Sequence, residues 1–190
     1  MLRWIPNLIS LARIALVPMV VASIASERFT LGVSLFFVAG FSDGIDGWLA
    51  RRFDWRTQIG AILDPIADKL LLIGTFIVMA LVGVTPWWLA ALVVLRDLTI
   101  MGGAIAYHFL YGDLEGKPSL VSKLNTVLML AYVFLALLDA AYPALLPSAL
   151  TETLAPLVLP ALMAALITTM LVSTLGYMLE WTRRAREHAA

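Results

Sequence analysis

The sequence predicts an all-α, polytopic membrane protein with six transmembrane helices. Of its 190 residues, 62% are hydrophobic and only 14% are charged, and the mean hydropathy is +0.93. A water-soluble surface needs more polar residues than this composition supplies. A bilayer core about 30 Å thick needs roughly 20 mainly apolar residues per helix, and several stretches reach that length. We expect residues 1–190 to form a single membrane domain.

The expected helices follow one another with short connections. Their ranges are Leu8–Ser26, Phe29–Leu49, Ile59–Val84, Trp87–Tyr111, Val121–Tyr142 and Ala155–Leu179. A short interfacial segment, Met1–Asn7, precedes them, with a tryptophan suited to the headgroup level and a proline suited to a helix start. Glu27–Arg28 and Gly83–Pro86 are expected to be tight turns. The four prolines within residues 142–160 predict a loop followed by a late or broken helix start.

The basic residues gather on one side of these helices. They are Arg3, Arg51, Arg52, Arg56, Lys117, Lys123, Arg183, Arg184 and Arg186, against Arg28 alone on the other side. By the positive-inside rule, both termini are expected in the cytoplasm. Arg13 interrupts the first apolar run and no clear small-residue cleavage site follows, so we expect a retained first span. The sequence has no long Arg/Ser-rich transit segment, which favours a bacterial inner membrane over an organelle.

Composition also excludes several kinds of chemistry. The formal net charge is zero, which gives no reason to expect nucleic-acid binding. The chain has no cysteine, so disulfides, thiol catalysis and cysteine-ligated metal sites are excluded.

Four aspartates lie where the second expected helix ends and the third begins. Asp43 and Asp46 are three residues apart, and Asp64 and Asp68 are four apart, so each pair shares one helix face. Small residues extend those faces with little side-chain bulk: Gly47, Ala50 and Gly60. Clustered carboxylates repel one another, and ionised groups near hydrocarbon are costly. This constellation therefore requires positive charge.

Arg51 and Lys69 are expected to supply part of that charge, but the ligand set favours metal ions. Carboxylate oxygens without histidine or cysteine suit hard cations such as Mg²⁺ or Mn²⁺, and paired ions of this kind bind pyrophosphate in many enzymes. Taken alone, Asp64–Pro65 also suits an N-cap followed by proline at the first helical position. A divalent-cation carrier lined by these acids is a further alternative, although transport favours acids deep within the spans.

The whole segment resembles the signature of the CDP-alcohol phosphatidyltransferases. Residues 43–68 read D-x2-D-G-x2-A-R-x8-G-x3-D-x3-D without a departure. The resemblance implies a homodimer of six-span subunits. It also implies transfer of a phosphatidyl group from CDP-diacylglycerol to an alcohol, with CMP as the leaving group.

The resemblance further implies a role for each matching residue. Asp43, Asp46 and Asp64 are expected to bind two divalent ions, Mg²⁺ or Mn²⁺. Asp68 is expected both to contact the ions and to act as the general base. The other matching positions are expected to bind CDP-diacylglycerol, with three small residues leaving room for the nucleotide and an arginine contacting its phosphates: Gly47, Ala50, Gly60 and Arg51.

Three further stretches bear on the acceptor alcohol. Ile5–Arg13 is similar to the start of both phosphatidylglycerophosphate synthases and CDP-dependent cardiolipin synthases of this family. Leu95–Asp97 and Lys117–Thr126 resemble the eukaryotic-type cardiolipin synthases, and Leu124–Asn125 replaces a Gly-Lys pair usual in the glycerophosphate enzymes. We therefore expect phosphatidylglycerol as acceptor, with glycerol 3-phosphate as the alternative. The expected acceptor-binding residues are Arg96, Lys117, Lys123 and Asn125.

Arg96 and Asp97 lie well inside the fourth expected helix, where charge is expensive unless paired or hydrated. Two interpretations stay open for them. They form a structural ion pair between neighbouring helices, or they form a polar wall of the acceptor cavity.

Overall fold

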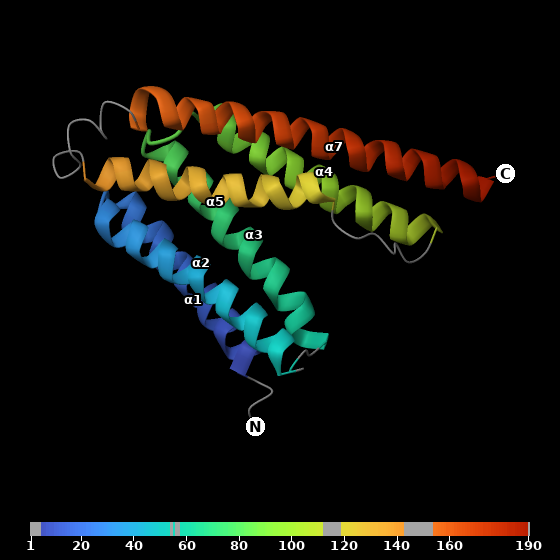
Figure 1. Cartoon of the computed structure of the whole chain (residues 1–190), viewed down its shortest axis with the longest axis horizontal. Helices are drawn as coiled ribbons and strands as arrows, with labels where there is room; N and C mark the ends of the chain where they lie inside the picture. The colour runs from blue at the N-terminus through green and yellow to red at the C-terminus, as the bar shows by residue number, and fades with distance from the viewer. Residues whose placement is uncertain (1–4, 54, 56–57, 112–118, 143–153, 190) are drawn as a thin grey trace.

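The computed structural model describes residues 5–53, 55, 58–111, 119–142 and 154–189. All regular secondary structure within these ranges is helical, which confirms the all-α class. The elements are α1 (Ile5–Ala25), α2 (Phe29–Arg52), α3 (Gln58–Leu81), α4 (Trp87–Tyr111), α5 (Leu120–Ala141), the π-helical turn η2 (Leu154–Val158) and α7 (Leu159–Ala189) (Figure 1).

Each expected helix has a counterpart, and two boundaries differ in an informative way. Helix α7 continues to Ala189, well past the end of the expected span at Leu179, because the Glu, Arg and Ala residues of the tail favour helix in water as well. Helix α3 begins at Gln58, so Pro65 lies inside the helix and Asp64 is not its N-cap. The expected late helix start is present as the π-helical turn before α7.

Four of the helices are long and apolar enough to cross a membrane. They contain Asn7–Ala25, Trp87–Tyr107, Leu120–Ala141 and Pro156–Arg183, and Phe29–Ile45 forms a shorter apolar helix. Large apolar side chains are also exposed, among them Leu81 and Phe109 at 80% and 82%. Such a surface suits a hydrocarbon environment. The chain is a membrane protein with four candidate spans among the described residues, and six crossings stay a prediction.

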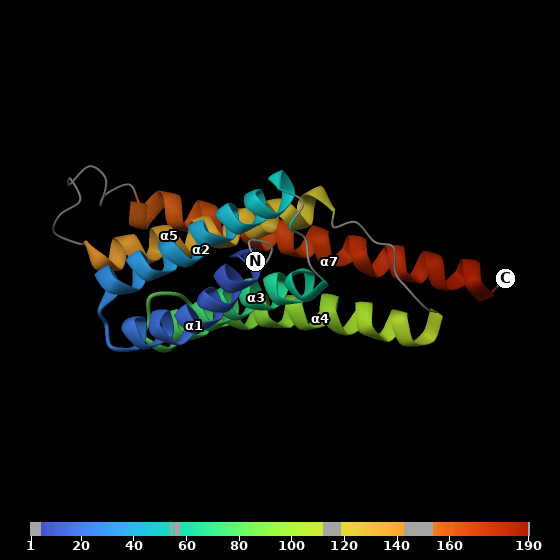
Figure 2. The same cartoon turned by 90° about the horizontal axis from the view of Figure 1, so that it is seen from below.

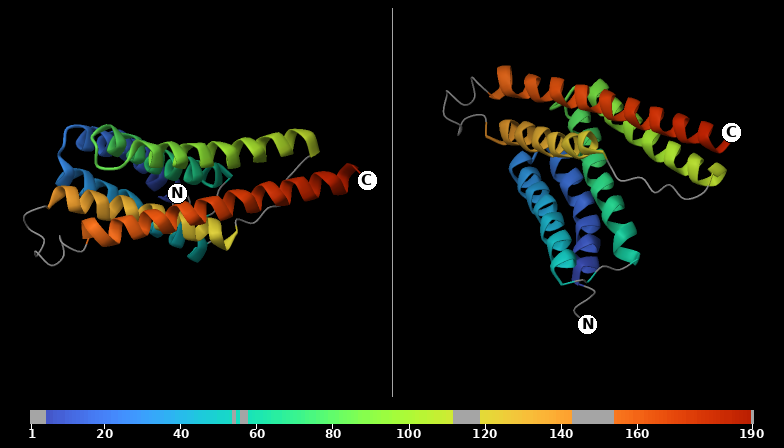
Figure 3. Two further views of the ribbon diagram at one scale, coloured as in Figure 1. Left: turned by 90° about the horizontal axis from the view of Figure 1, so that it is seen from above. Right: turned by 45° about the vertical axis from the view of Figure 1, so that its right-hand side comes forward.

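The helices form two groups. Helix α1 packs against both α2 and α3, whereas α4 and α5 pack against α7. Helices α2 and α5, and helices α3 and α4, connect the groups. Figures 1 and 3 show that the start of α1, the end of α2 and the start of α3 lie at the same end of the first group, and Figure 2 shows the same bundle from below. Since the aspartates lie near the end of α2 and the start of α3, this topology brings them together.

The two tight turns predicted at the other helix ends are confirmed. Glu27 and Gly83 both have left-handed backbone conformations, with φ of 57° and 79°, which reverse the chain within a few residues. The second turn is fixed to α5 because Thr85 and Tyr132 share a hydrogen bond of 2.6 Å between their hydroxyl oxygens. The Tyr132 ring stacks on Phe76 with 5.9 Å between ring centroids. This contact joins α3 to α5 in the core.

Gly103 of α4 lies under the ring of Trp181 of α7, which generates a test of this packing. A Cβ atom at Gly103 would lie 2.0 Å from Cζ3 of Trp181, whereas one at Gly102 would meet nothing within 4 Å. Both alanine substitutions remove the helix penalty of glycine, about 1 kcal/mol. Only Gly103→Ala must also displace the indole ring, at a cost of about 1–3 kcal/mol.

We therefore expect the melting temperature of the purified protein to fall for Gly103→Ala and to rise or stay unchanged for Gly102→Ala. Equal melting temperatures for the two variants would contradict close packing of α4 on α7 at this level.

Candidate active site

One face of α1 is polar over the first half of the helix, although most of the helix is apolar. Asn7, Ser10 and Arg13 follow at intervals of three residues, and their exposed fractions are 7%, 0% and 0%. Residues at this spacing lie on one side of a helix. Because α1 packs against α2 and α3, this face meets the aspartates of both helices.

Arg13 joins two of the predicted aspartates. Its Nη1 atom donates a hydrogen bond of 2.5 Å to Oδ1 of Asp43 on α2, and the same atom donates to Oδ1 of Asp68 on α3. The Arg13 side chain is fully buried, while the side chains of Asp43 and Asp68 are 43% and 42% exposed. The guanidinium therefore lies on the protein side of the carboxylates, which keep an open side.

A third predicted aspartate meets the same face of α1. The hydroxyl of Ser10 donates to Oδ1 of Asp64 at 2.5 Å. Asp43, Asp64 and Asp68 thus converge on α1 from two neighbouring helices. Of the expected nucleotide-binding positions, Gly60 is buried and Gly47 is half-buried. Three further predictions fall on side chains outside the described part of the structure: Asp46, Ala50 and Arg51.

The donor set of this site fits a hard divalent cation. Among the described side chains, which omit Asp46, no three acidic, histidine or cysteine groups gather closely enough to bind one ion. However, Asp43 and Asp68 contact a single nitrogen atom of Arg13, so they lie close enough to share one positive charge. The ligands are carboxylate oxygens with an exposed side, as Mg²⁺ and Mn²⁺ require.

A second polar cluster surrounds Asp97 of α4. Nη1 of Arg96 donates to Oδ1 of Asp97 at 2.6 Å, and Nζ of Lys69 on α3 lies 3.4 Å from Oδ2 of Asp97. Nη2 of Arg96 also donates to the hydroxyls of Ser122 on α5, at 3.0 Å, and Ser173 on α7, at 3.2 Å. The interhelical ion pair that the sequence left open is therefore present, between Lys69 and Asp97.

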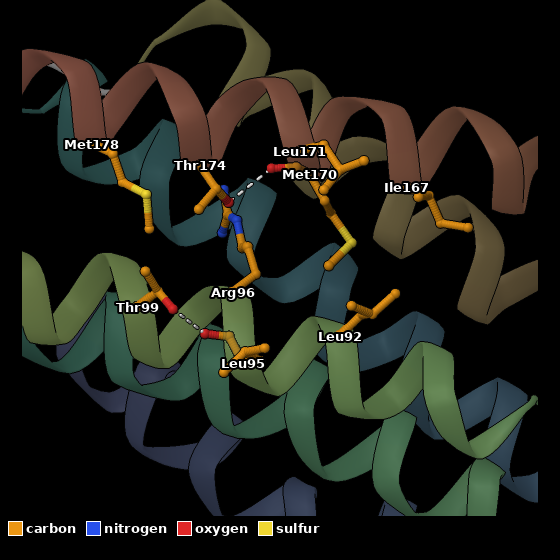
Figure 4. A pocket seen from close by; sticks show the side chains of 9 residues that line it. All are labelled: Leu92, Leu95, Arg96, Thr99, Ile167, Met170, Leu171, Thr174 and Met178. Carbon is orange, nitrogen blue, oxygen red and sulfur yellow. Dashed lines mark hydrogen bonds between the residues drawn. The ribbon is translucent and has the colours of Figure 1, made fainter.

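Arg96 also lines a pocket between α4 and α7. The pocket has a volume of about 210 Å³. Figure 4 shows the Arg96 side chain reaching from α4 toward Thr174 of α7. The lining residues are Leu92, Leu95, Arg96, Thr99, Ile167, Met170, Leu171, Thr174 and Met178. Apart from the guanidinium and two hydroxyls, the walls are apolar, which suits a hydrocarbon chain.

Two other expected acceptor residues, Asn125 and Lys123, are described and do not line this pocket. Asn125 is fully buried on α5, where its Oδ1 accepts from the Thr169 hydroxyl at 3.0 Å and its Nδ2 donates to Sδ of Met129 at 3.4 Å. Lys123 is exposed on α5. Lys117 lies outside the described residues.

The sequence contains a signal for Arg13 and Ser10 outside the acidic motif. A charged residue in an apolar span marks a functional position by default, and the polar residues Asn7, Ser10 and Arg13 share one helix face. Arg13 served only as evidence against signal-peptide cleavage. Its partners are more distant in sequence, so spacing alone did not identify them.

A family model described as CDP-alcohol phosphatidyltransferase matches residues 3–174, which include the whole acidic motif and all of α1 to α5. The chain belongs to the CDP-alcohol phosphatidyltransferase family. The resemblance seen in residues 43–68 is thereby confirmed, and the protein is a transferase of this family.

Curated relatives of this CDP-alcohol phosphatidyltransferase include cardiolipin synthases. The chain is 35% identical over 151 residues to a probable CMP-forming cardiolipin synthase of Drosophila melanogaster, covering 70% of this chain and 46% of the relative. It is 30% identical over 145 residues to the human CMP-forming cardiolipin synthase, covering 68% and 48%. A chloroplastic CDP-diacylglycerol–glycerol-3-phosphate 3-phosphatidyltransferase of rice is 33% identical over 155 residues, covering 73% and 47%. The chain spans about half the length of these relatives.

The Asp97 cluster gives a matched pair of substitutions. Asp97→Asn leaves the charge of the nearly buried Arg96 without its carboxylate, and breaking a buried pair in this way costs about 3–5 kcal/mol. Lys69→Gln removes a side chain that is 37% exposed, and such pairs contribute about 1 kcal/mol or less. We expect Asp97→Asn to lower the melting temperature much more than Lys69→Gln. Equal decreases in melting temperature for the two variants would show that Asp97 does not compensate the charge of Arg96.

Proposed function

We propose that the chain transfers a phosphatidyl group from CDP-diacylglycerol to phosphatidylglycerol and forms cardiolipin and CMP. The observation that carries the proposal is the convergence of Asp43, Asp64 and Asp68 from two helices of a complete family motif. Relatives named as cardiolipin synthases support the choice of reaction. The rice relative keeps phosphatidylglycerophosphate synthesis from glycerol 3-phosphate as the alternative.

The carboxylates of Asp43, Asp46, Asp64 and Asp68 would hold two divalent ions, Mg²⁺ or Mn²⁺. Bound there, the ions would neutralise pyrophosphate charge and stabilise the entering and leaving oxygens. Asp68 acts as general base and accepts the proton of the acceptor hydroxyl. As that oxygen bonds to the phosphorus next to diacylglycerol, the bond from this phosphorus to the bridging oxygen breaks. CMP leaves with the electron pair.

The nucleotide site is proposed from the remaining motif positions. Gly47, Ala50 and Gly60 leave room for the cytidine nucleotide next to the backbone, and Arg51 contacts its phosphates.

The acceptor is proposed to bind between α4, α5 and α7. Lys69 follows Asp68 directly and pairs with Asp97, and Asp97 pairs with Arg96 at the α4–α7 pocket. A continuous set of contacts therefore links the general base to the pocket. Arg96, Lys117, Lys123 and Asn125 stay the proposed acceptor residues, with Arg96 supported by its place in the pocket wall.

The charge of the pocket favours a lipid acceptor. Glycerol 3-phosphate carries a phosphomonoester of about −1.5 to −2 charge, by analogy with other phosphate monoesters, and such a group needs several converging cations. Arg96 is the one cation among the residues that line the described pocket, and it shares its charge with Asp97. A phosphodiester with an acyl chain matches this single guanidinium and the apolar walls.

The proposed setting is a bacterial inner membrane crossed six times, with both termini and the aspartates on the cytoplasmic side. The one-sided distribution of Lys and Arg supports this orientation. Residues 1–190 are proposed to act as one domain, and a homodimer follows from the family resemblance. The alternative of another class, a divalent-cation carrier, is disfavoured because the acidic motif spans the end of α2 and the start of α3, which meet at one end of the first group of helices (Figure 1).

Asp68→Asn tests the general base. The substitution keeps side-chain size but removes proton acceptance, and general-base contributions are typically about 100- to 10,000-fold. We expect turnover to fall by at least about 100-fold, while CDP-diacylglycerol binding stays measurable. Asp139→Asn, the same chemical change outside the motif, is the control and should leave CMP release unchanged. Near-normal turnover in Asp68→Asn would remove this residue from the mechanism.

CMP release by the purified protein with each acceptor tests the proposed reaction. Phosphatidylglycerol should support CMP release and yield cardiolipin, and EDTA should stop the reaction until Mg²⁺ or Mn²⁺ is added. Rapid release with glycerol 3-phosphate and none with phosphatidylglycerol would establish the alternative acceptor. No release with any alcohol, together with Mn²⁺ flux into sealed vesicles, would establish the carrier.

Two leucines of α7 provide a matched control for the pocket in the same assay. Leu171 and Leu175 are both 58% exposed, but only Leu171 lines the pocket. Leu171→Trp should raise the KM for phosphatidylglycerol several-fold without raising that for CDP-diacylglycerol. Leu175→Trp should change neither KM. Equal changes of the KM for phosphatidylglycerol in the two variants would show that the α4–α7 pocket is not part of the acceptor site.

A further inference from the structure

Arg13 is the most deeply buried charge in the described structure that neither the family motif nor the proposed mechanism uses. Its side chain has no exposed surface. A buried guanidinium is costly unless its charge is compensated within the protein. The compensation comes from Asp43 and Asp68, which lie on two different helices. The charge of Arg13 and the arrangement of these aspartates therefore depend on each other.

The charge balance of the site explains why such a cation is needed. The three aspartates with described side chains, Asp43, Asp64 and Asp68, bring three negative charges, and Arg13 is the positive group in contact with two of them. Lys69, the next cation along α3, lies beside Asp97 instead. Without Arg13, Asp43 and Asp68 would lose the positive charge that they share, and the repulsion between them would rise whenever no divalent ion is bound.

The geometry also leaves the carboxylates accessible. Arg13 approaches from the buried side, and Asp43 and Asp68 keep 43% and 42% of their side-chain surface exposed. Outer groups that hold metal ligands in this way orient them and tune ion binding. Ser10 makes the equivalent contact with Asp64.

We infer that Arg13 is a positioning residue. It acts as a resident counter-cation that holds Asp43 and Asp68 together in the metal-free protein and leaves their exposed sides for the divalent ion. This inference rests on the metal-binding part of the proposed function. It assigns α1, which lies outside the family motif, the role of keeping the site assembled between turnovers.

The test compares the melting temperatures of wild type, Arg13→Gln and Arg13→Lys in EDTA and in millimolar Mn²⁺. In EDTA, Arg13→Gln should melt several degrees below wild type, because Asp43 and Asp68 then lose the positive charge that they share. Mn²⁺ should close at least half of that gap, since the ion supplies the missing charge. Arg13→Lys, which keeps the charge, should have a melting temperature in EDTA between those of wild type and Arg13→Gln. Turnover of Arg13→Gln should fall about 10- to 100-fold.

A second substitution separates this role from ordinary packing. Adding Asp43→Asn to Arg13→Gln removes one of the two carboxylates that contact Arg13 in the wild type, so the double variant should melt above Arg13→Gln in EDTA. The inference alone would be overturned if wild type and Arg13→Gln differed in melting temperature by the same amount in EDTA and in Mn²⁺, and if the double variant melted no higher than Arg13→Gln. A wild type whose melting temperature does not respond to Mn²⁺ would overturn the metal-binding proposal and the inference with it.

Discussion

A charge that is buried in an apolar helix bundle has to be compensated inside the bundle, and this constraint organises the structure. Arg13 contacts Asp43 and Asp68 on two different helices, so the first three helices are held together by charge as well as by apolar packing. Removing Arg13 or its aspartate partners would break a buried ion pair, which costs several kcal/mol even after relaxation. The same contacts that satisfy the constraint place the motif aspartates side by side.

Helix α3 connects this site to the other polar cluster. Asp68 and Lys69 are consecutive, and consecutive residues of a helix point about 100° apart. Asp68 therefore faces α1, whereas Lys69 faces Asp97 on α4. From Asp97 the contacts continue through Arg96 to α5 and α7. Helix α3 thus makes polar contacts with both groups of helices, next to the proposed base Asp68.

Much of the fold was predictable because it depends on local sequence. The lengths of the apolar stretches predicted the helices, and the short polar segments between them predicted the turns at Glu27 and Gly83. The spacing of the acidic motif predicted which aspartates share a face. The role of Arg13 was not predictable in this way, because its partners are 30 and 55 residues away and depend on how three helices pack. The α4–α7 pocket likewise depends on side-chain packing between segments far apart in the chain.

Pro65 lies within α3, between Asp64 and Asp68. Proline has no backbone N–H, so the carbonyl of Ala61, one turn earlier, loses its usual helical hydrogen bond. The turn that carries Gly60 is therefore joined to the rest of α3 by a weakened backbone ladder, and such positions are where helices bend. The backbone of α3 is therefore weakest inside the acidic motif itself. The contacts with α1 from Ser10 to Asp64 and from Arg13 to Asp68 hold the helix on both sides of that point.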